Sequence, residues 1–225
     1  MINKISYFVS WSGGKDSCLA LFRAMEKYGK PKYLLTMLTE NGDRSRSHGI
    51  DRAILQKQAN LLQIPIYFCA ATWNNYEATF IKAMKNLKKQ GVKMGVFGDI
   101  NYTNDINWKL HRQWADQVCH QVEMISYEPL WDDSVHDLLQ EFFEKKWIAK
   151  IIAVNSKILN KNYLGKILNK QLIDEFLACG IDPAGEKGEY HTIVLDGPLF
   201  TQPLLATEKE SVLKNDYWFL NLILT

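Results

Sequence analysis

The stretch ISYFVSWSGGKDSCLALFRAM, residues 5–25, decides the fold. Residues 5–11 are apolar enough to form a short buried strand, and residues 18–25 have the composition of a helix. Between them lies SGGKDS, in which two consecutive glycines permit a turn that residues with a Cβ atom would resist. Such a turn, followed by a helix, directs several backbone N–H groups at one place. These groups can bind an anion such as phosphate.

The side chains of this segment favour the same ligand. Two serine hydroxyls can donate hydrogen bonds, and Lys15 adds a mobile positive charge. A Walker A loop is excluded, because no glycine lies at the required spacing before Gly14 and Asp16 replaces its Ser or Thr. The GxGxxG pattern of dinucleotide-binding proteins is also missing. We therefore predict a phosphate-binding loop of another kind, formed by Ser12, Gly13, Gly14, Lys15, Asp16 and Ser17.

The composition is that of a soluble α/β domain with an appended lobe. The chain has 225 residues, 47% hydrophobic and 23% charged, and its net charge of +2 indicates no surface for long nucleic acid. Four widely spaced cysteines without a CxxC pair argue against a zinc site or disulfides, so we expect buried thiols in a reducing compartment. Neither a signal peptide nor a membrane-spanning run is evident. We expect a soluble cytoplasmic protein without a membrane partner; whether it forms a homodimer stays open.

Strand-like and helix-like segments alternate after the loop. Further strands are expected at 32–38, 64–69, 92–97 and 124–127, with helices at 51–62, 76–90 and 110–123. Strands separated by such helices form parallel βαβ units. We therefore expect an α/β fold, a doubly wound parallel sheet of about five strands, over residues 1–131.

The pattern loosens after Trp131, where we place a boundary. Residues 132–225 are expected to form a smaller α+β lobe that binds the substrate. Its expected elements are helices at 135–146 and 172–180, a strand at 148–154, irregular or edge structure at 194–205, and a hairpin over 212–224 that turns at Asn215-Asp216.

Ligands of doubly wound sheets bind at the carboxyl ends of the strands. The loop at 12–17, Thr39, Asp99 and Trp131 all fall at such ends, and His48 lies in the loop after the second strand. Asp99 could hold Mg²⁺ between the protein and a polyphosphate, with Asp16 as the other candidate, although a turn explains Asp99 equally well. Three other tryptophans, Trp73, Trp108 and Trp114, are expected in the core or between packed elements.

A second polar group, GEKGEYHT at 185–192, precedes a strand in the C-terminal part. The carboxylates of Glu186 and Glu189 could hold an ammonium group or act as general bases, and His191 could carry a proton. An ordinary charged turn is the alternative. The candidate substrate-binding residues are Trp131, Gly185, Glu186, Gly188, Glu189 and Tyr190.

Together these motifs resemble known families. SGGKDS resembles the pyrophosphate loop, or PP-loop, SGGxDS, of the N-type ATP pyrophosphatases, which share an adenine nucleotide α hydrolase-like (HUP-like) fold and cleave ATP to AMP and pyrophosphate. Nearly the whole chain resembles the short form of the diphthine–ammonia ligase family. The motifs that carry this resemblance are, in order, SGGKDS, His48, Trp73 with Tyr76-Glu77, VFGDI at 96–100, His111-Arg112 with Trp114, Cys119, PLW at 129–131, Leu164-Gly165, GEKGEYHT and DGPLF at 196–200.

The resemblance implies amidation of the diphthine carboxylate on elongation factor 2, in diphthamide biosynthesis, with ATP, Mg²⁺ and free ammonia. It implies a catalytic role for Lys15, Asp16, Glu186, Glu189 and His191, and ATP binding by the loop together with Thr39, His48 and Asp99. Where the family has cysteine within Pro-Cys-Gly this chain has Ala184, so no thiol role is assigned there.

Rival interpretations are a PP-loop enzyme acting on a different small carboxylate and a non-catalytic ATP sensor. Members that thiolate tRNA carry cysteine pairs and a basic surface, which this sequence lacks. Glutamine-dependent synthetases often open with a catalytic cysteine after Met1, where this chain has Ile2.

Overall fold

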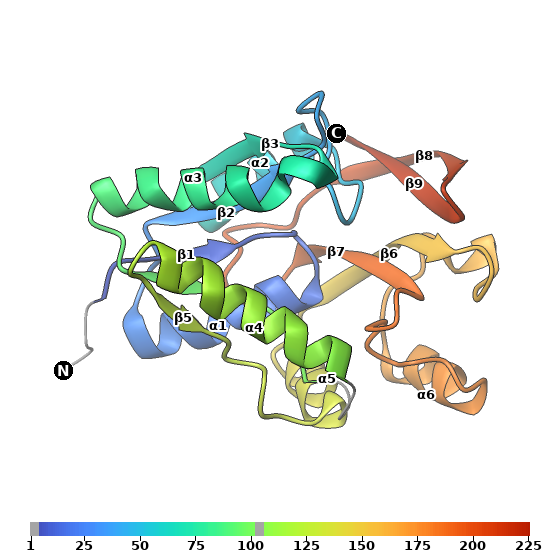
Figure 1. The fold of residues 1–225 in the computed structure, drawn as a ribbon. Helices are drawn as coiled ribbons and strands as arrows, with labels where there is room; N and C mark the ends of the chain where they lie inside the picture. Colours follow the sequence, from blue (N-terminus) through green and yellow to red (C-terminus); the bar gives the residue numbers. More distant parts are fainter. Residues whose placement is uncertain (1–4, 102–105) are drawn as a thin grey trace.

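The structure is a computed structural model that describes residues 5–101 and 106–225, with residues 106–111 described by their backbone alone. A five-stranded parallel sheet organises the N-terminal part, in the order β3-β2-β1-β4-β5 (Figure 1). Its strands are β1 (Tyr7–Ser10), β2 (Tyr33–Leu38), β3 (Ile66–Ala70), β4 (Met94–Val96) and β5 (Ile125–Tyr127). The helices between them are α1 (Lys15–Tyr28), α2 (Arg52–Leu62), α3 (Tyr76–Lys89) and α4 (Ile106–Gln121), and a short 3₁₀ helix, η1 (Trp73–Asn75), precedes α3.

Alternate residues of β1 show that the sheet is covered on both faces. Tyr7 and Val9 pack in a core with α1 and α2, whereas Phe8 packs in a second core with α3 and α4. All three side chains are fully buried. The chain winds outward from β1 to β3 and then returns to β4, so the connections diverge at the carboxyl ends of β1 and β4. Doubly wound sheets bind their ligands at such a divergence.

A four-stranded antiparallel sheet, in the order β7-β6-β9-β8, organises the C-terminal part. Its strands are β6 (Ile148–Asn155), β7 (Tyr190–Asp196), β8 (Ala206–Lys214) and β9 (Tyr217–Leu224). The helices are α5 (Val135–Glu144) and α6 (Lys170–Ala178), with a 3₁₀ turn, η2 (Lys161–Tyr163), between β6 and α6. The predicted hairpin turn is confirmed: Asn215 and Asp216 join β8 to β9 with φ of 49° and 64°, as a two-residue hairpin turn requires.

The two sheets share one apolar core. Phe22 of α1 and Trp147, just before β6, meet edge to face with ring centroids 6.2 Å apart. The buried Gln58 of α2 donates from Nε2 to the carbonyl oxygens of Gly13 and Val194, at 3.1 and 2.7 Å. These bonds hold β7 against the loop that follows β1.

The predicted parallel sheet of about five strands and the smaller C-terminal α+β part are confirmed. The prediction of irregular or edge structure at 194–205 is confirmed, because residues 194–196 end β7, an edge strand of the antiparallel sheet, and residues 197–205 form neither helix nor strand. The thiols of Cys18 and Cys119 are buried, but Cys69 is partly accessible and Cys179 is exposed, because it caps the end of α6. Trp108 and His111 lie outside the residues whose side chains are described. No helix in the described part of the chain has the length and apolar character needed to cross a membrane.

Candidate active site

The predicted loop connects β1 to α1, and close packing explains both of its glycines. Gly13 has a φ of +80°, and a Cβ atom there would lie 2.5 Å from Gln58 Oε1. A Cβ atom on Gly14 would lie 2.9 Å from His48 Nε2. Glycine therefore allows α2 and the loop before it to approach the turn.

Some amides of this loop are engaged and others are not. The Gly14 N–H donates to Ser12 Oγ at 3.2 Å, and the Lys15 N–H donates to Thr192 Oγ1 at 3.1 Å. The N–H groups of Gly13, Asp16 and Ser17 form no hydrogen bond to any described residue. The expected set of converging donors is thus present in part, at the positive end of α1.

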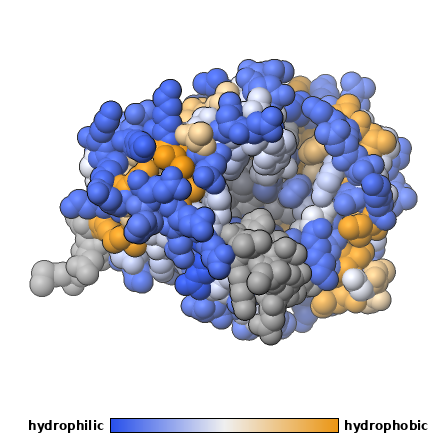
Figure 2. Space-filling view, in the orientation of Figure 1, coloured by the Kyte–Doolittle hydropathy of each residue, from blue (hydrophilic) through white to orange (hydrophobic). Residues whose placement is uncertain are grey.

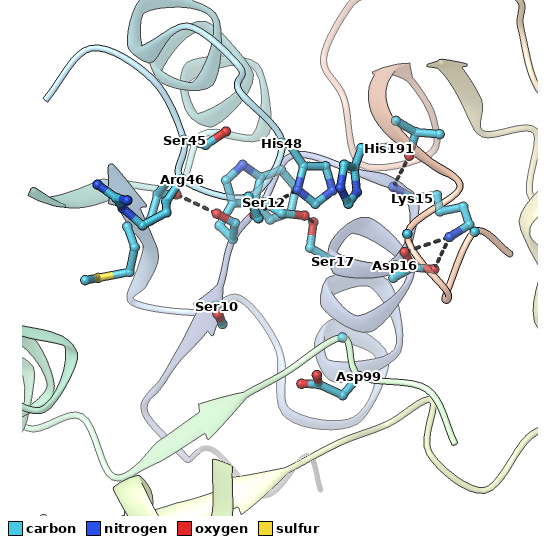
Figure 3. Close-up of a pocket in the computed structure, with 18 of the residues that line it drawn as sticks. Ser10, Ser12, Lys15, Asp16, Ser17, Ser45, Arg46, His48, Asp99 and His191 are labelled. Atoms are coloured by element: carbon cyan, nitrogen blue, oxygen red, sulfur yellow. Dashed lines mark hydrogen bonds and ion pairs between the residues drawn. The ribbon is translucent and has the colours of Figure 1, made fainter. Parts of the chain in front are cut away.

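A cavity of about 360 Å³ lies at the carboxyl ends of the parallel strands, against the loop that precedes β7. Figure 2 shows this face of the molecule hollowed near its centre, with hydrophilic side chains around the hollow. Eleven of the predicted site residues line the cavity, several of which are labelled in Figure 3: Ser12, Lys15, Asp16, Ser17, His48, Asp99, Gly185, Glu186, Gly188, Tyr190 and His191. The loop after β1 and the GEKGEYHT segment at 185–192, which we call the signature loop, therefore share one site.

Lys15 lies at the centre of the charged part of the cavity. Its ammonium group is 2.8 Å from the Asp16 carboxylate and 3.8 Å from Glu186 Oε1 (Figure 3 shows the Asp16 contacts). Burial opposes the charge of Lys15, but Asp16, Tyr190 and Glu186 outweigh it, so the pKa of Lys15 is raised. Its ammonium group therefore stays charged near neutral pH.

Glu186 is the carboxylate with the largest displacement of its pKa. Its side chain is 15% exposed. Burial, and then repulsion by Asp16, raise its pKa from 4.5 to about 8, against the opposing attraction of Lys15. A carboxyl group with a pKa near the working pH can both accept and donate a proton.

Two histidines contact each other in the lining of the cavity. The rings of His48 and His191 are 4.5 Å apart, and His191 also stacks on Tyr217 of β9 at 5.9 Å. Burial and the Lys15 charge lower the pKa of His191 to about 4. Burial, His191 and Lys15 lower the pKa of His48 well below its usual value. Both rings are therefore neutral near pH 7.

The signature loop is held by two carboxylates, one just before the loop and one within it. Asp182 accepts hydrogen bonds from the amides of Ala184 and Glu186, at 3.1 and 2.6 Å. Glu189 is buried and accepts from the amides of Asp182 and Lys187, at 3.4 and 3.0 Å. The structure thus places Glu189 inside the loop, whereas Glu186 lines the cavity.

Two more of the predicted site residues, Thr39 and Trp131, lie outside the cavity lining besides Glu189 and the two loop glycines. The amide of Thr39 donates to the Arg44 carbonyl in the loop after β2. Trp131 is buried, with the Arg112 guanidinium 5.3 Å from its ring. Trp73, expected in the core, is instead 67% exposed at the cavity. It stacks on Tyr76 at 5.7 Å.

Several lining residues were not predicted from the sequence. Besides Trp73, they are Ser10, Trp11, Leu35, Thr36, Met37, Ser45, Arg46, Ser47, Tyr76, Gly98, Ala184 and Thr192. Arg46 is the clearest case: its guanidinium lies 5.1 Å from the Trp73 ring, and its Nε is buried without a hydrogen-bond partner in the described structure. Its place next to two serines and His48 was the only signal in the sequence.

Within the described residues, no three His, Cys, Asp or Glu side chains converge as a metal site. Asp16 and Asp99 both line the cavity. Mg²⁺ is commonly held by one or two carboxylates, with the remaining positions filled by phosphate oxygens and water. The donors present therefore fit Mg²⁺ that arrives with a polyphosphate.

Comparison with known proteins assigns the chain to a family. The family model described as the diphthamide synthase N-terminal domain matches residues 5–126, and the one described as the C-terminal domain matches residues 134–223. The chain belongs to the diphthamide synthase family. The matched ranges include both the loop at 12–17 and the signature at 185–192, which meet in the cavity.

This member of the diphthamide synthase family covers different shares of its relatives' lengths. A diphthine–ammonia ligase of Schizosaccharomyces pombe is 26% identical over 89% of this chain and 36% of its own length. One of Rattus norvegicus is 25% identical over 90% of this chain and 83% of its own length. The chain thus spans about a third of the yeast protein. A solved structure described as a predicted subunit of tRNA methyltransferase from Methanocaldococcus jannaschii is 15% identical, with a TM-score of 0.46, over 86% of this chain and 97% of that one.

Proposed function

We propose that this chain is an ATP-dependent ligase that adenylates a carboxylate, releases pyrophosphate and amidates the acyl group with ammonia. The observation that supports this most is the 3.8 Å approach of Lys15, in the loop after β1, to Glu186 of the signature loop, inside one cavity. The family relatives that carry the name diphthine–ammonia ligase suggest diphthine on elongation factor 2 as the carboxylate.

The proposal divides the work between two parts of the chain. Residues 1–131 would bind ATP, and residues 132–225 would bind the acceptor. The cavity has walls from both parts, because Thr36 and Asp99 line it from the parallel sheet and Gly188 and Thr192 from the other side. A nucleotide and an acyl group could therefore be held against each other there.

The first chemical need is to stabilise the departing pyrophosphate. Lys15 is the cation that we assign to this charge, and at about 4 Å a unit charge contributes ~4 kcal/mol at an effective dielectric constant near 20. The N–H groups of Gly13, Asp16 and Ser17 add fixed donors that need no reorganisation. Asp16 and Asp99 would hold Mg²⁺, which when bound neutralises phosphate charge.

The second need is to transfer the acyl group. The ammonia nitrogen attacks the carbonyl carbon of the adenylate, a C–N bond forms, and AMP leaves with the electron pair of the broken C–O bond. The nitrogen then carries a surplus proton. Glu186 in its ionised form is the base that we assign to this proton, because its pKa of about 8 matches the task. Neutral His191 remains a hydrogen-bonding wall of the acceptor site.

Isotope exchange tests the proposal. Labelled pyrophosphate should enter ATP only when diphthine-bearing elongation factor 2 is present, and added ammonium chloride should convert the factor to its amide, detected by mass spectrometry. Exchange that depends on another carboxylate would favour the alternative of a different acceptor. ATP binding with no exchange under any condition would favour a sensor and contradict the proposal.

A further inference from the structure

A second, smaller cavity adjoins the charged end of the main one. It lies between the first turn of α1, the start of α5, Ile100 after β4, and Ala184 of the signature loop. Lys15, Asp16 and Ala184 line both cavities. These three residues therefore lie between the small cavity and the main one.

The walls of the small cavity are otherwise apolar. Its remaining lining residues are Leu19, Ile100, Val135, Leu138, Leu139 and Phe142. All of these except Val135 are at most 6% exposed. The cavity volume is about 10 Å³, close to the roughly 10–15 Å³ that one water-sized molecule needs. Its occupant must be very small and must tolerate an apolar wall.

Ammonia is a molecule of this size, and its charge determines whether it can enter the cavity. An ammonium ion would lose its hydration among leucine, isoleucine and phenylalanine side chains without gaining an unoccupied counter-ion, because Asp16 is already paired with Lys15. Uncharged ammonia has no such penalty. Its transfer out of bulk water also costs less free energy than the transfer of a water molecule. Ammonia is also the nucleophile that the proposed reaction consumes.

From this geometry we infer that the cavity between α1 and α5 binds uncharged ammonia and delivers it past Lys15 and Ala184 to the acyl group. The inference rests on the proposed function. Ammonium sheds its proton to bulk water before entry, and the nitrogen arrives with its electron pair free. Ala184 lines both cavities with a small side chain and precedes Glu186, the proposed base, by two residues.

The first test narrows the cavity. Val135→Leu adds one methylene at the least buried of the apolar lining positions. It should raise the KM for ammonia about tenfold or more, as a methylene does in a tight apolar site. Pyrophosphate exchange driven by diphthine-bearing elongation factor 2 should be unchanged. Val122→Leu enlarges a buried valine that lines neither cavity, and should leave both quantities unchanged.

The second test widens the cavity and does not depend on Val135→Leu folding. Leu139→Val should let methylamine serve as nucleophile, whereas the unaltered protein should discriminate strongly against it. The inference would be wrong if folded Val135→Leu had an unchanged KM for ammonia, or if Leu139→Val still discriminated against methylamine. Pyrophosphate exchange in the same experiments would still support the proposed function. Absence of pyrophosphate exchange in the unaltered protein would contradict both the inference and the proposed function.

Discussion

Lys15 is the single residue on which the proposed ATP chemistry depends most. It is buried, charged and held between Asp16 and Glu186, so the site already contains the cation that a leaving pyrophosphate needs. Free of nucleotide, this ammonium is neutralised by carboxylates; with nucleotide, we expect phosphate oxygens to compete for it. A buried charge is costly to isolate, which explains why two acidic groups lie beside it.

Lys15→Met should lower the rate of pyrophosphate exchange about 10²- to 10³-fold, which is the usual effect of removing one preorganised charge-stabilising group. Methionine keeps the length of the side chain but not its charge. Lys150→Met, on β6 away from the cavity, is the matched control because Lys150 is paired with Glu208 outside the site. A similar loss in both variants would contradict the assigned role.

Glu186 should make both stability and activity depend on pH. Its folded-state pKa of about 8 lies above its ordinary value of 4.5. The stability it contributes is therefore full below about pH 4.5 and is lost as the pH rises through about 8, on the order of a few kcal/mol. Denaturant unfolding from pH 5 to 9 should show this fall, and Glu186→Gln should remove it.

The activity should move in the opposite direction. If ionised Glu186 is the base, kcat/KM for amidation rises with an apparent pKa near 8, and Glu186→Gln loses that limb while retaining pyrophosphate exchange. An unaltered rise in the glutamine variant would assign the proton to another group.

At the scale of elements, the turn between β1 and α1 depends on its packing against α2. Gly13 and Gly29 have nearly equal φ angles, +80° and +79°, but only a Cβ atom on Gly13 meets other residues within 4 Å. A comparison of substitutions at Gly13 and Gly29 therefore distinguishes the cost of backbone strain from the cost of a steric clash.

Gly29→Ala should lower the free energy of unfolding by about 1–3 kcal/mol through its φ alone. Gly13→Ala should lose a further ~1–3 kcal/mol, because the new methyl group meets Gln58 and Leu55. It should also weaken ATP binding, which Gly29→Ala should leave intact. Calorimetry of unfolding and of ATP binding checks both; equal losses in the two variants would refute the close-approach explanation.

The hairpin β8–β9 reaches the site through Tyr217 at the start of β9. Its hydroxyl donates to the Gly188 carbonyl at 2.7 Å, and its ring stacks on His191. Tyr217 is thus a positioning residue for the signature loop, although it is 25 residues or more along the chain from that loop.

Tyr217→Phe should raise the KM for the acceptor about 3- to 10-fold, the value of one hydrogen bond of 0.5–1.5 kcal/mol, and leave the KM for ATP unchanged. Tyr163→Phe removes a hydroxyl that bonds Glu175 at the surface and should change neither. Steady-state kinetics with each substrate varied in turn distinguishes these cases. Equal shifts in both KM values would indicate general distortion instead.

At the scale of the molecule, the sequence predicted site residues that form one continuous motif better than residues that tertiary packing brings together. SGGKDS was found because strand, turn and helix follow one another, and the alternation of strands and helices placed this loop at the edge of a parallel sheet. Arg46 and Thr192 were missed because they reach the cavity only through the packing of a loop and of β7.

Other differences between prediction and structure arise because a sequence does not show in which direction a side chain points. Glu186 and Glu189 are both acidic and lie three residues apart in one glycine-rich turn, so spacing could not tell which one faces the cavity. Trp73 was expected in the core because most tryptophans are buried, yet it begins the 3₁₀ turn η1 at the cavity, with Arg46 over its ring. The small cavity beside α5 has no sequence signature, because its walls come from four separate segments.

The fate of ATP labelled in its α-phosphate tests the central claim most directly. With diphthine-bearing elongation factor 2 and ammonium chloride present, the account predicts that the label appears as AMP, with one unlabelled pyrophosphate released for each amide formed. Label appearing as ADP would show that the bond between the β- and γ-phosphates is broken instead, and would contradict the account.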